Sequence, residues 1–301
     1  RKAVVGLALG SGSARGWAHI GVIQALEEAG IHADIVCGTS IGGLVGAAYA
    51  AGELPRFGKW VTSLSRREVV SLMDPGLSGG MLKGAKVMEF FRKNFVDRPI
   101  NELNLPFGVV ATVLHTGAEI WLRAGSTVEA VRASIGMPGL FAPVRYDGRI
   151  LVDGGLVNPV PVSLARAMGA EIVIAIDLSS DLLARRHVHA ELVVPGTPPG
   201  RVSAWMRKLQ DTFGAAGTET APTESVLLPS MLTTVAQGLN IMQVRIARSR
   251  MAGEPPELVI APRLAHVGLL EFHRGGEAIE EGRHAVEVSL HGLDALGLRS
   301  T

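Results

Sequence analysis

The sequence predicts an α/β fold: a three-layer α/β/α sandwich with a mostly parallel central sheet. Short apolar runs alternate with helical patterns along most of the chain, and glycine-rich turns follow several of these runs. This alternation is typical of parallel strands whose crossover helices cover both faces of a sheet. Because strand-like runs recur almost to the C-terminus, we expect residues 1–301 to form a single domain.

The individual elements are predicted from apolar periodicity and from the turn residues that bound each segment. Strands are predicted at 4–9, 34–37, 107–114, 119–123, 150–152, 172–177 and 258–261. Helices are predicted at 18–29, 41–51, 86–94, 127–134, 161–168, 230–250 and 272–290. A second interpretation exists for the first residues, because two basic residues before an apolar run resemble a short signal peptide. We favour a buried first strand.

Two segments interrupt the alternation. Residues 63–83 are predicted as a glycine-rich surface excursion, and residues 179–225 as a loop or lid that precedes a helical region from about 226. Within the lid, one helical face carries Val202, Trp205, Met206, Leu209 and Phe213. We expect this lid helix to pack on the domain, with a membrane-surface helix as the alternative.

The composition excludes several functional classes. The chain has 29 Lys and Arg against 28 Asp and Glu, so it lacks the basic excess of a nucleic-acid-binding protein. Its single cysteine excludes an internal disulfide and a cysteine-based zinc site, and it suits a reducing compartment. Only 19% of the residues are charged, which argues against intrinsic disorder. No stretch reaches the roughly 18 apolar residues of a membrane span, and we expect a cytoplasmic protein.

The first chemical motif is Gly38-Thr39-Ser40-Ile41-Gly42, between a predicted strand and a predicted helix. A nucleophile elbow needs glycine on both sides of its serine, because the backbone there is strained and passes close to its neighbours. Ser40 would stand at a helix N-terminus, whose dipole and free N–H groups stabilise negative charge on an attacked carbonyl. The alternative is that Ser40 only caps the helix.

The second motif is a glycine-rich turn, again between a strand and a helix: Gly10-Ser11-Gly12-Ser13-Ala14-Arg15-Gly16. The N–H groups of such a turn can cradle phosphate, so a nucleotide site is the rival hypothesis. The spacing argues against it, because Arg15 stands where a dinucleotide motif needs glycine and no Gly-Lys-Ser/Thr follows. A loop of N–H donors beside a nucleophile elbow is what an oxyanion hole needs.

The third motif, Asp153-Gly154-Gly155, places a carboxylate at the end of a predicted strand. A conventional triad would also need a late histidine; the candidates are His266, His273, His284 and His291. Most of these lie in a polar helical pattern, and Ser40 follows only two predicted strands, fewer than in a usual α/β-hydrolase. We therefore favour a Ser-Asp dyad. An ordinary Asp pKa of about 3.9 makes a poor base unless burial raises it.

Together the three motifs resemble the patatin-like phospholipase family and are most similar to its bacterial RssA-type branch. The resemblance rests on residues 7–22, 38–42 and 153–161, and similar residues extend it to nearly the whole chain: 221–223, 250–253 and 272–274. It implies a three-layer α/β/α fold and a dyad that hydrolyses fatty-acyl esters of (lyso)phospholipids or related lipids, without metal or cofactor. Membrane contact would be peripheral and transient, at the inner membrane face.

The resemblance also implies a role for each motif residue. Ser40 would be the nucleophile and Asp153 the base. The remaining motif residues would be Gly10, Ser11, Gly12, Ser13, Arg15 and Gly16 in the oxyanion loop, Gly38 and Gly42 at the elbow, and Gly154 and Gly155 after the acid. The chain departs from the family at Ser11 and Ser13, where many members have glycine. Serine still supplies an N–H group, so the loop works if both serines adopt the turn.

Some alternatives stay open at this point. A lipid-binding or regulatory protein without catalysis could use the same fold, and a nucleotide-binding protein could use the Gly10 turn. We expect Arg15 to pair within the fold and Cys37 to be buried and inert. Residues 134–143, rich in Gly, Pro and Phe, either line an acyl pocket or pack in the core.

Overall fold

A computed structural model of the chain describes residues 3–74, 82–182 and 231–298. The predicted lid at 179–225 lies outside the described residues except for its first four positions, and so does the apolar face around Trp205. Within the described residues, no helix is long and apolar enough to cross a membrane.

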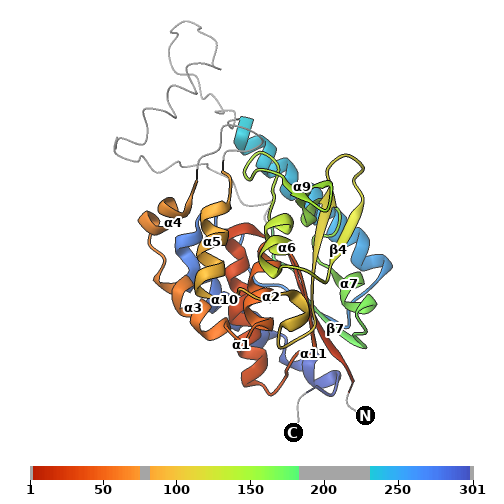
Figure 1. The fold of residues 1–301 in the computed structure, drawn as a ribbon. Helices are drawn as coiled ribbons and strands as arrows, with labels where there is room; N and C mark the ends of the chain where they lie inside the picture. The colour runs from red at the N-terminus through yellow and green to blue at the C-terminus, as the bar shows by residue number, and fades with distance from the viewer. Residues whose placement is uncertain (1–2, 75–81, 183–230, 299–301) are drawn as a thin grey trace, which may run out of the picture.

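An eight-stranded sheet forms the centre of the described structure (Figure 1). Its strands are β1 (Val5–Leu9), β2 (Ile35–Thr39), β3 (Phe107–Val113), β4 (Glu119–Leu122), β5 (Val144–Tyr146), β6 (Arg149–Asp153), β7 (Ile172–Ile176) and β8 (Leu258–Ile260). The order is β5-β6-β3-β2-β1-β7-β8, with β4 paired to β3. Strands β3, β2, β1, β7 and β8 run parallel, while β4 and β6 pair antiparallel with β3. The predicted, mostly parallel α/β fold is confirmed.

The central strands are buried on both faces, which explains why they read as continuous apolar runs. In β1, Leu7 and Leu9 join one core cluster while Ala8 joins the other. In β2, Val36 and Cys37 divide between the two faces in the same way. Because successive side chains of a strand alternate between faces, the sheet separates two layers of helices.

Most helices cover one face of the sheet. This layer contains α1 (Ala18–Glu28), α2 (Ile41–Ala50), α3 (Leu54–Ser63), α4 (Arg66–Leu72), α5 (Ala85–Asn94), α6 (Thr127–Ser134), α10 (Gly275–Val288) and α11 (Leu290–Ala295). The opposite face is covered by α7 (Val162–Ala167) and α9 (Met231–Gly253), as Figure 1 shows. Short 3₁₀ turns link strands to helices, among them η1 (Ser13–Trp17) and η3 (Gly154–Leu156).

The structure adds a helix to the predicted surface excursion at 63–83, because α4 occupies part of it. Most residues of α4 are exposed, as expected of a surface segment. The helix begins with a capping box, in which the Ser65 hydroxyl accepts from the Glu68 N–H and the Glu68 carboxylate accepts from the Ser65 N–H. Val69 then packs into the core. The preceding helix α3 and strand β5 were not predicted either, and the helix predicted at 272–290 is a 3₁₀ turn followed by α10.

Candidate active site

Ser40 lies in a strained turn between β2 and α2, as the elbow motif predicted. Its backbone adopts φ 57° and ψ −123°, a conformation that a non-glycine residue rarely takes. Both flanking glycines are required by close approach of backbone. A Cβ atom on Gly42 would stand 2.2 Å from the carbonyl oxygen of Leu9, and one on Gly38 would stand 2.4 Å from the backbone of Gly42.

Asp153 ends β6 and reaches Ser40 directly. The Ser40 hydroxyl donates a hydrogen bond of 2.6 Å to Asp153 Oδ2, although 113 residues separate the two in sequence. The other carboxylate oxygen, Oδ1, accepts from the Gly155 N–H at 2.7 Å. Both side chains are buried. The structure therefore brings the predicted nucleophile and acid together, with no side chain between them.

Burial raises the pKa of Asp153 from its usual 3.8 to about 6, and the hydrogen bonds from Ser40 and Gly155 oppose this rise. A carboxylate with a pKa near 6 is a stronger base than an ordinary aspartate, yet it is still largely ionised at neutral pH. Asp153 thus has both the position and the protonation state that a base for Ser40 needs.

Ser134 supports the nucleophile, and the sequence did not single it out for this role. The Ser40 N–H donates to Ser134 Oγ at 2.8 Å, and the Ser134 hydroxyl donates to the Val110 carbonyl at 2.6 Å. This pair of bonds joins the elbow to β3 through the end of α6. A serine at the end of a predicted amphipathic helix carries no pattern that distinguishes it from an ordinary core serine.

The glycine-rich turn lies beside the elbow, but its N–H groups are not equivalent. Those of Gly10 and Ser11 donate to the carbonyls of Ile176 and Pro159, at 3.0 and 2.8 Å. Those of Gly12 and Ser13 donate no hydrogen bond to any residue that the structure describes. Ser13 adopts φ 53°, so a serine does occupy the left-handed conformation that the turn requires here.

Further contacts anchor this turn from a distance. The buried Arg15 donates from Nε to the carbonyl of Val267 at 3.1 Å, which confirms that it is held within the fold. A Cβ atom on Gly16 would stand 2.2 Å from the side chain of Ile41, so only glycine allows η1 to pack on α2. The Ser11 hydroxyl donates to Gln243 Oε1 at 3.3 Å, a contact from α9 that no sequence motif indicated.

His19 is a second residue that the motifs did not identify. It is fully buried on α1, and its Nε2 lies 2.7 Å from the carbonyl oxygen of Gly10. Burial lowers its pKa to about 4, so the ring is neutral and Nε2–H donates to that carbonyl. A histidine on the buried face of a predicted helix, directly after the glycine-rich turn, is the signal that could have revealed it.

Three of the four late histidines have other partners. His266 contacts Glu277 at 2.7 Å, His273 accepts from Arg66 at 3.1 Å, and His284 contacts Glu287 at 3.4 Å. None of these contacts includes Ser40 or Asp153. The argument from the sequence against a triad agrees with this arrangement.

A family model described as Patatin-like phospholipase matches residues 7–166 of the chain. The chain belongs to the patatin-like phospholipase family. An uncharacterized NTE family protein of Mycobacterium tuberculosis is 32% identical over 96% of this chain and 92% of its own length. The human patatin-like phospholipase domain-containing protein 6 is 40% identical over 58% of this chain, and lysophospholipase nte1 of Emericella nidulans is 37% identical over 58%. The matched regions are 13% and 12% of these two longer proteins.

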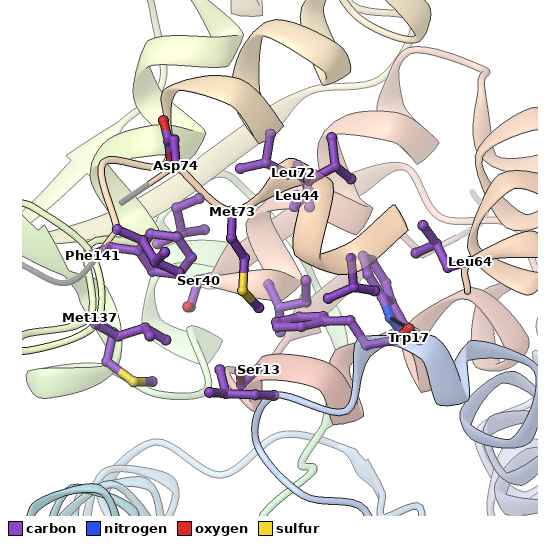
Figure 2. Close-up of a pocket in the computed structure, with 18 of the residues that line it drawn as sticks. Ser13, Trp17, Ser40, Leu44, Leu64, Leu72, Met73, Asp74, Met137 and Phe141 are labelled. Atoms are coloured by element: carbon purple, nitrogen blue, oxygen red, sulfur yellow. Dashed lines mark hydrogen bonds between the residues drawn. The ribbon is translucent and has the colours of Figure 1, made fainter. Parts of the chain in front are cut away.

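In this patatin-like chain an apolar pocket of about 110 Å³ opens onto Ser40 (Figure 2). Ser13 lines the same pocket, so the glycine-rich turn borders the space next to the nucleophile. Met137 and Phe141 line it as well, which shows that part of 134–143 borders this pocket. The carboxylate of Asp74 points away from Ser40. Its Oδ2 accepts a hydrogen bond of 2.8 Å from the N–H of Ala85, at the start of α5.

Proposed function

We propose that the protein is a serine acyl hydrolase that cleaves fatty-acyl esters of (lyso)phospholipids or related lipids through Ser40 and Asp153. The patatin-like family supports lipid ester hydrolysis in general. The observation that carries the specific proposal is the hydrogen bond of 2.6 Å between Ser40 Oγ and Asp153 Oδ2. Ser40 lies in a strained strand-to-helix turn, and it lines an apolar pocket.

In the acylation step, Ser40 Oγ attacks the ester carbonyl while its proton passes to Asp153 Oδ2. The carbonyl oxygen becomes an oxyanion, for which Gly12 and Ser13 hold the available N–H donors. One such donor is typically worth about 2.7–4 kcal/mol of transition-state stabilisation. The protonated Asp153 then returns the proton to the leaving oxygen, so that the alcohol or lysolipid departs and an acyl ester of Ser40 remains.

Deacylation repeats these steps with water. Asp153 accepts a proton from the water molecule as its oxygen attacks the acyl carbonyl, and the same two N–H groups hold the second oxyanion. When this intermediate collapses, the proton returns from Asp153 to Ser40 Oγ and the fatty acid is released. The cycle needs no group besides the dyad and the loop. A bilayer substrate requires transient, peripheral contact with the membrane surface.

A fluorophosphonate probe tests the proposal, because it labels only an activated serine. We expect the parent protein to label and to hydrolyse short p-nitrophenyl esters, and Ser40→Ala to do neither. Ser289→Ala is the matched control, since it removes a hydroxyl that bonds only to the Ala285 carbonyl. Equal labelling of the Ser40→Ala and parent proteins would contradict the assignment, as would an unlabelled parent. An unlabelled parent that still binds fatty acid would point to the non-catalytic, lipid-binding alternative.

A further inference from the structure

The pocket next to Ser40 has an open side and a closed side. Met137 and Phe141, on one side of Ser40, are half-buried, whereas Trp17 and Leu64, on the other side, are buried (Figure 2). A substrate chain whose ester reaches Ser40 from the half-buried side would therefore extend its methyl end toward Trp17 and Leu64. These two residues stand where the chain must stop.

An aromatic cluster forms a wall at this closed side. The buried Trp17 and the half-buried Trp60 line the pocket, and their rings meet edge to face, with centroids 6.4 Å apart. Phe57 lies behind both, at 5.8 Å from Trp17 and 5.5 Å from Trp60. The indole of Trp17 also donates to the carbonyl of Phe272 at 3.0 Å. Packed rings with a fixed hydrogen bond cannot move aside for a longer chain without losing these contacts.

Leu64 is the aliphatic side chain at this end of the pocket. It follows α3 directly, in an extended conformation with φ −60° and ψ 115°, and its side chain enters the pocket from the connection to α4. Only 6% of it is exposed. Shortening Leu64 would add space at the closed end while leaving the aromatic wall in place, and enlarging it would remove space.

We propose that Leu64, backed by the wall of Trp17 and Trp60, sets the longest acyl chain that the pocket accepts. This proposal rests on the proposed function for its catalytic readout, but not for its binding readout. Each CH₂ group that enters the apolar pocket should raise kcat/KM about fourfold, the equivalent of about 0.8 kcal/mol. The increase should end at the chain length that reaches Leu64.

The test measures kcat/KM for p-nitrophenyl esters from butyrate to palmitate, below the concentrations at which they form micelles. In Leu64→Ala, we expect kcat/KM to keep rising to longer acyl chains than in the parent. In Leu64→Phe, we expect the rise to end at a shorter chain. Leu54→Ala is the matched control. Leu54 begins α3, the helix that Leu64 follows, is 3% exposed and does not line the pocket, so its loss weakens the core without changing the length limit.

A binding series separates this proposal from the proposed function. Fatty acids of the same lengths are titrated into Ser40→Ala, with and without the Leu64 changes, and followed by tryptophan fluorescence. If the proteins that keep Ser40 hydrolyse no ester while the binding limit in Ser40→Ala still moves with residue 64, the length proposal would be supported and the hydrolase rejected. An unmoved limit in both Leu64→Ala and Leu64→Phe, while esters are hydrolysed, would reject the length proposal alone. Leu64→Val and melting curves identify effects that come from unfolding.

Discussion

The turns after β1 and β2 lie side by side in the sheet and are held in place by different means. The β2 turn, which carries Ser40, is fixed by contacts of Gly38 and Gly42 with backbone that directly neighbours them. The β1 turn is instead held by carbonyls that lie far along the chain, those of Ile176, Pro159 and Leu269. The elbow backbone is thus held by close steric approach together with one hydrogen bond to Ser134, whereas the glycine-rich turn is held by hydrogen bonds to distant carbonyls.

Both turns nevertheless place a serine in the left-handed region, at φ 57° for Ser40 and φ 53° for Ser13. Such a conformation costs on the order of 1–3 kcal/mol, and it persists only where surrounding structure holds it. For Ser40, the strained backbone serves to position the side chain, because its hydroxyl must reach Asp153. For Ser13 the backbone N–H is what matters. Substitutions on the two sides should therefore have different signatures.

The largest effect should come from Asp153→Asn, which removes the base but keeps the shape. We expect kcat/KM to fall about a thousandfold or more. The folded protein raises the pKa of Asp153 from 3.8 to about 6, so its stabilising effect is complete below pH 3.8 and is lost as the pH rises through 6. Asparagine does not ionise, so the variant does not bear the cost of burying a charged side chain. Between about pH 4 and pH 8, the variant should gain about 2 kcal/mol of unfolding free energy relative to the parent.

Urea unfolding of both proteins at the two pH values measures this gain, and ester hydrolysis measures the loss of activity. Thr112→Val is a useful control, because Thr112 bonds to the backbone carbonyl of Asp153 and not to its carboxylate. A difference in stability that stays constant with pH would show that burial does not raise the pKa of Asp153.

The next largest effect should come from Gly42→Ala, which tests the local fixation of the elbow. Its new methyl group would meet the Leu9 carbonyl oxygen at 2.2 Å, and backbone atoms cannot rotate away. We expect a loss of about 3 kcal/mol of unfolding free energy. Gly276→Ala is the matched control, since it meets nothing within 4 Å and should stabilise α10 by about 0.5 kcal/mol. Equal changes in unfolding free energy for the two substitutions would contradict the close approach of Gly42 to the Leu9 carbonyl.

A third prediction concerns the pH dependence of kcat/KM, which reports the ionisation of Asp153 in the dyad. Because Asp153 must be ionised to accept the Ser40 proton, kcat/KM should fall tenfold for each pH unit below about 6. His19 lies nearest to the loop, but its pKa of about 4 places its titration well below this range. Initial rates of ester hydrolysis across pH 4–8 give the profile. An inflection near the ordinary 3.8 would show that burial does not tune this carboxylate.

The contrast between the turns also explains what could be predicted from the sequence. The elbow, the Asp153 turn and the parallel strands follow from glycine positions and apolar runs, which are local patterns. Three features of the site depend on partners that lie far away in sequence: the occupied N–H groups of Gly10 and Ser11, and the contact from Gln243. The helix within the predicted excursion at 63–83 was missed for a different reason, because its Ser65 to Glu68 capping box is a local pattern that apolar periodicity does not reveal.

The smallest effect should come from Ser13, and it tests whether this turn works through its backbone. The Ser13 hydroxyl donates to the Leu269 carbonyl at 2.5 Å. Ser13→Ala keeps the left-handed strain and loses this bond, so we expect about 1 kcal/mol less stability. Ser13→Gly loses the bond but relieves the strain, and the two effects should nearly cancel. Both variants keep the N–H, so kcat should stay within about tenfold of the parent. A loss of kcat as severe as that of Ser40→Ala would instead assign the chemistry to the Ser13 hydroxyl, and the two turns would no longer differ in kind.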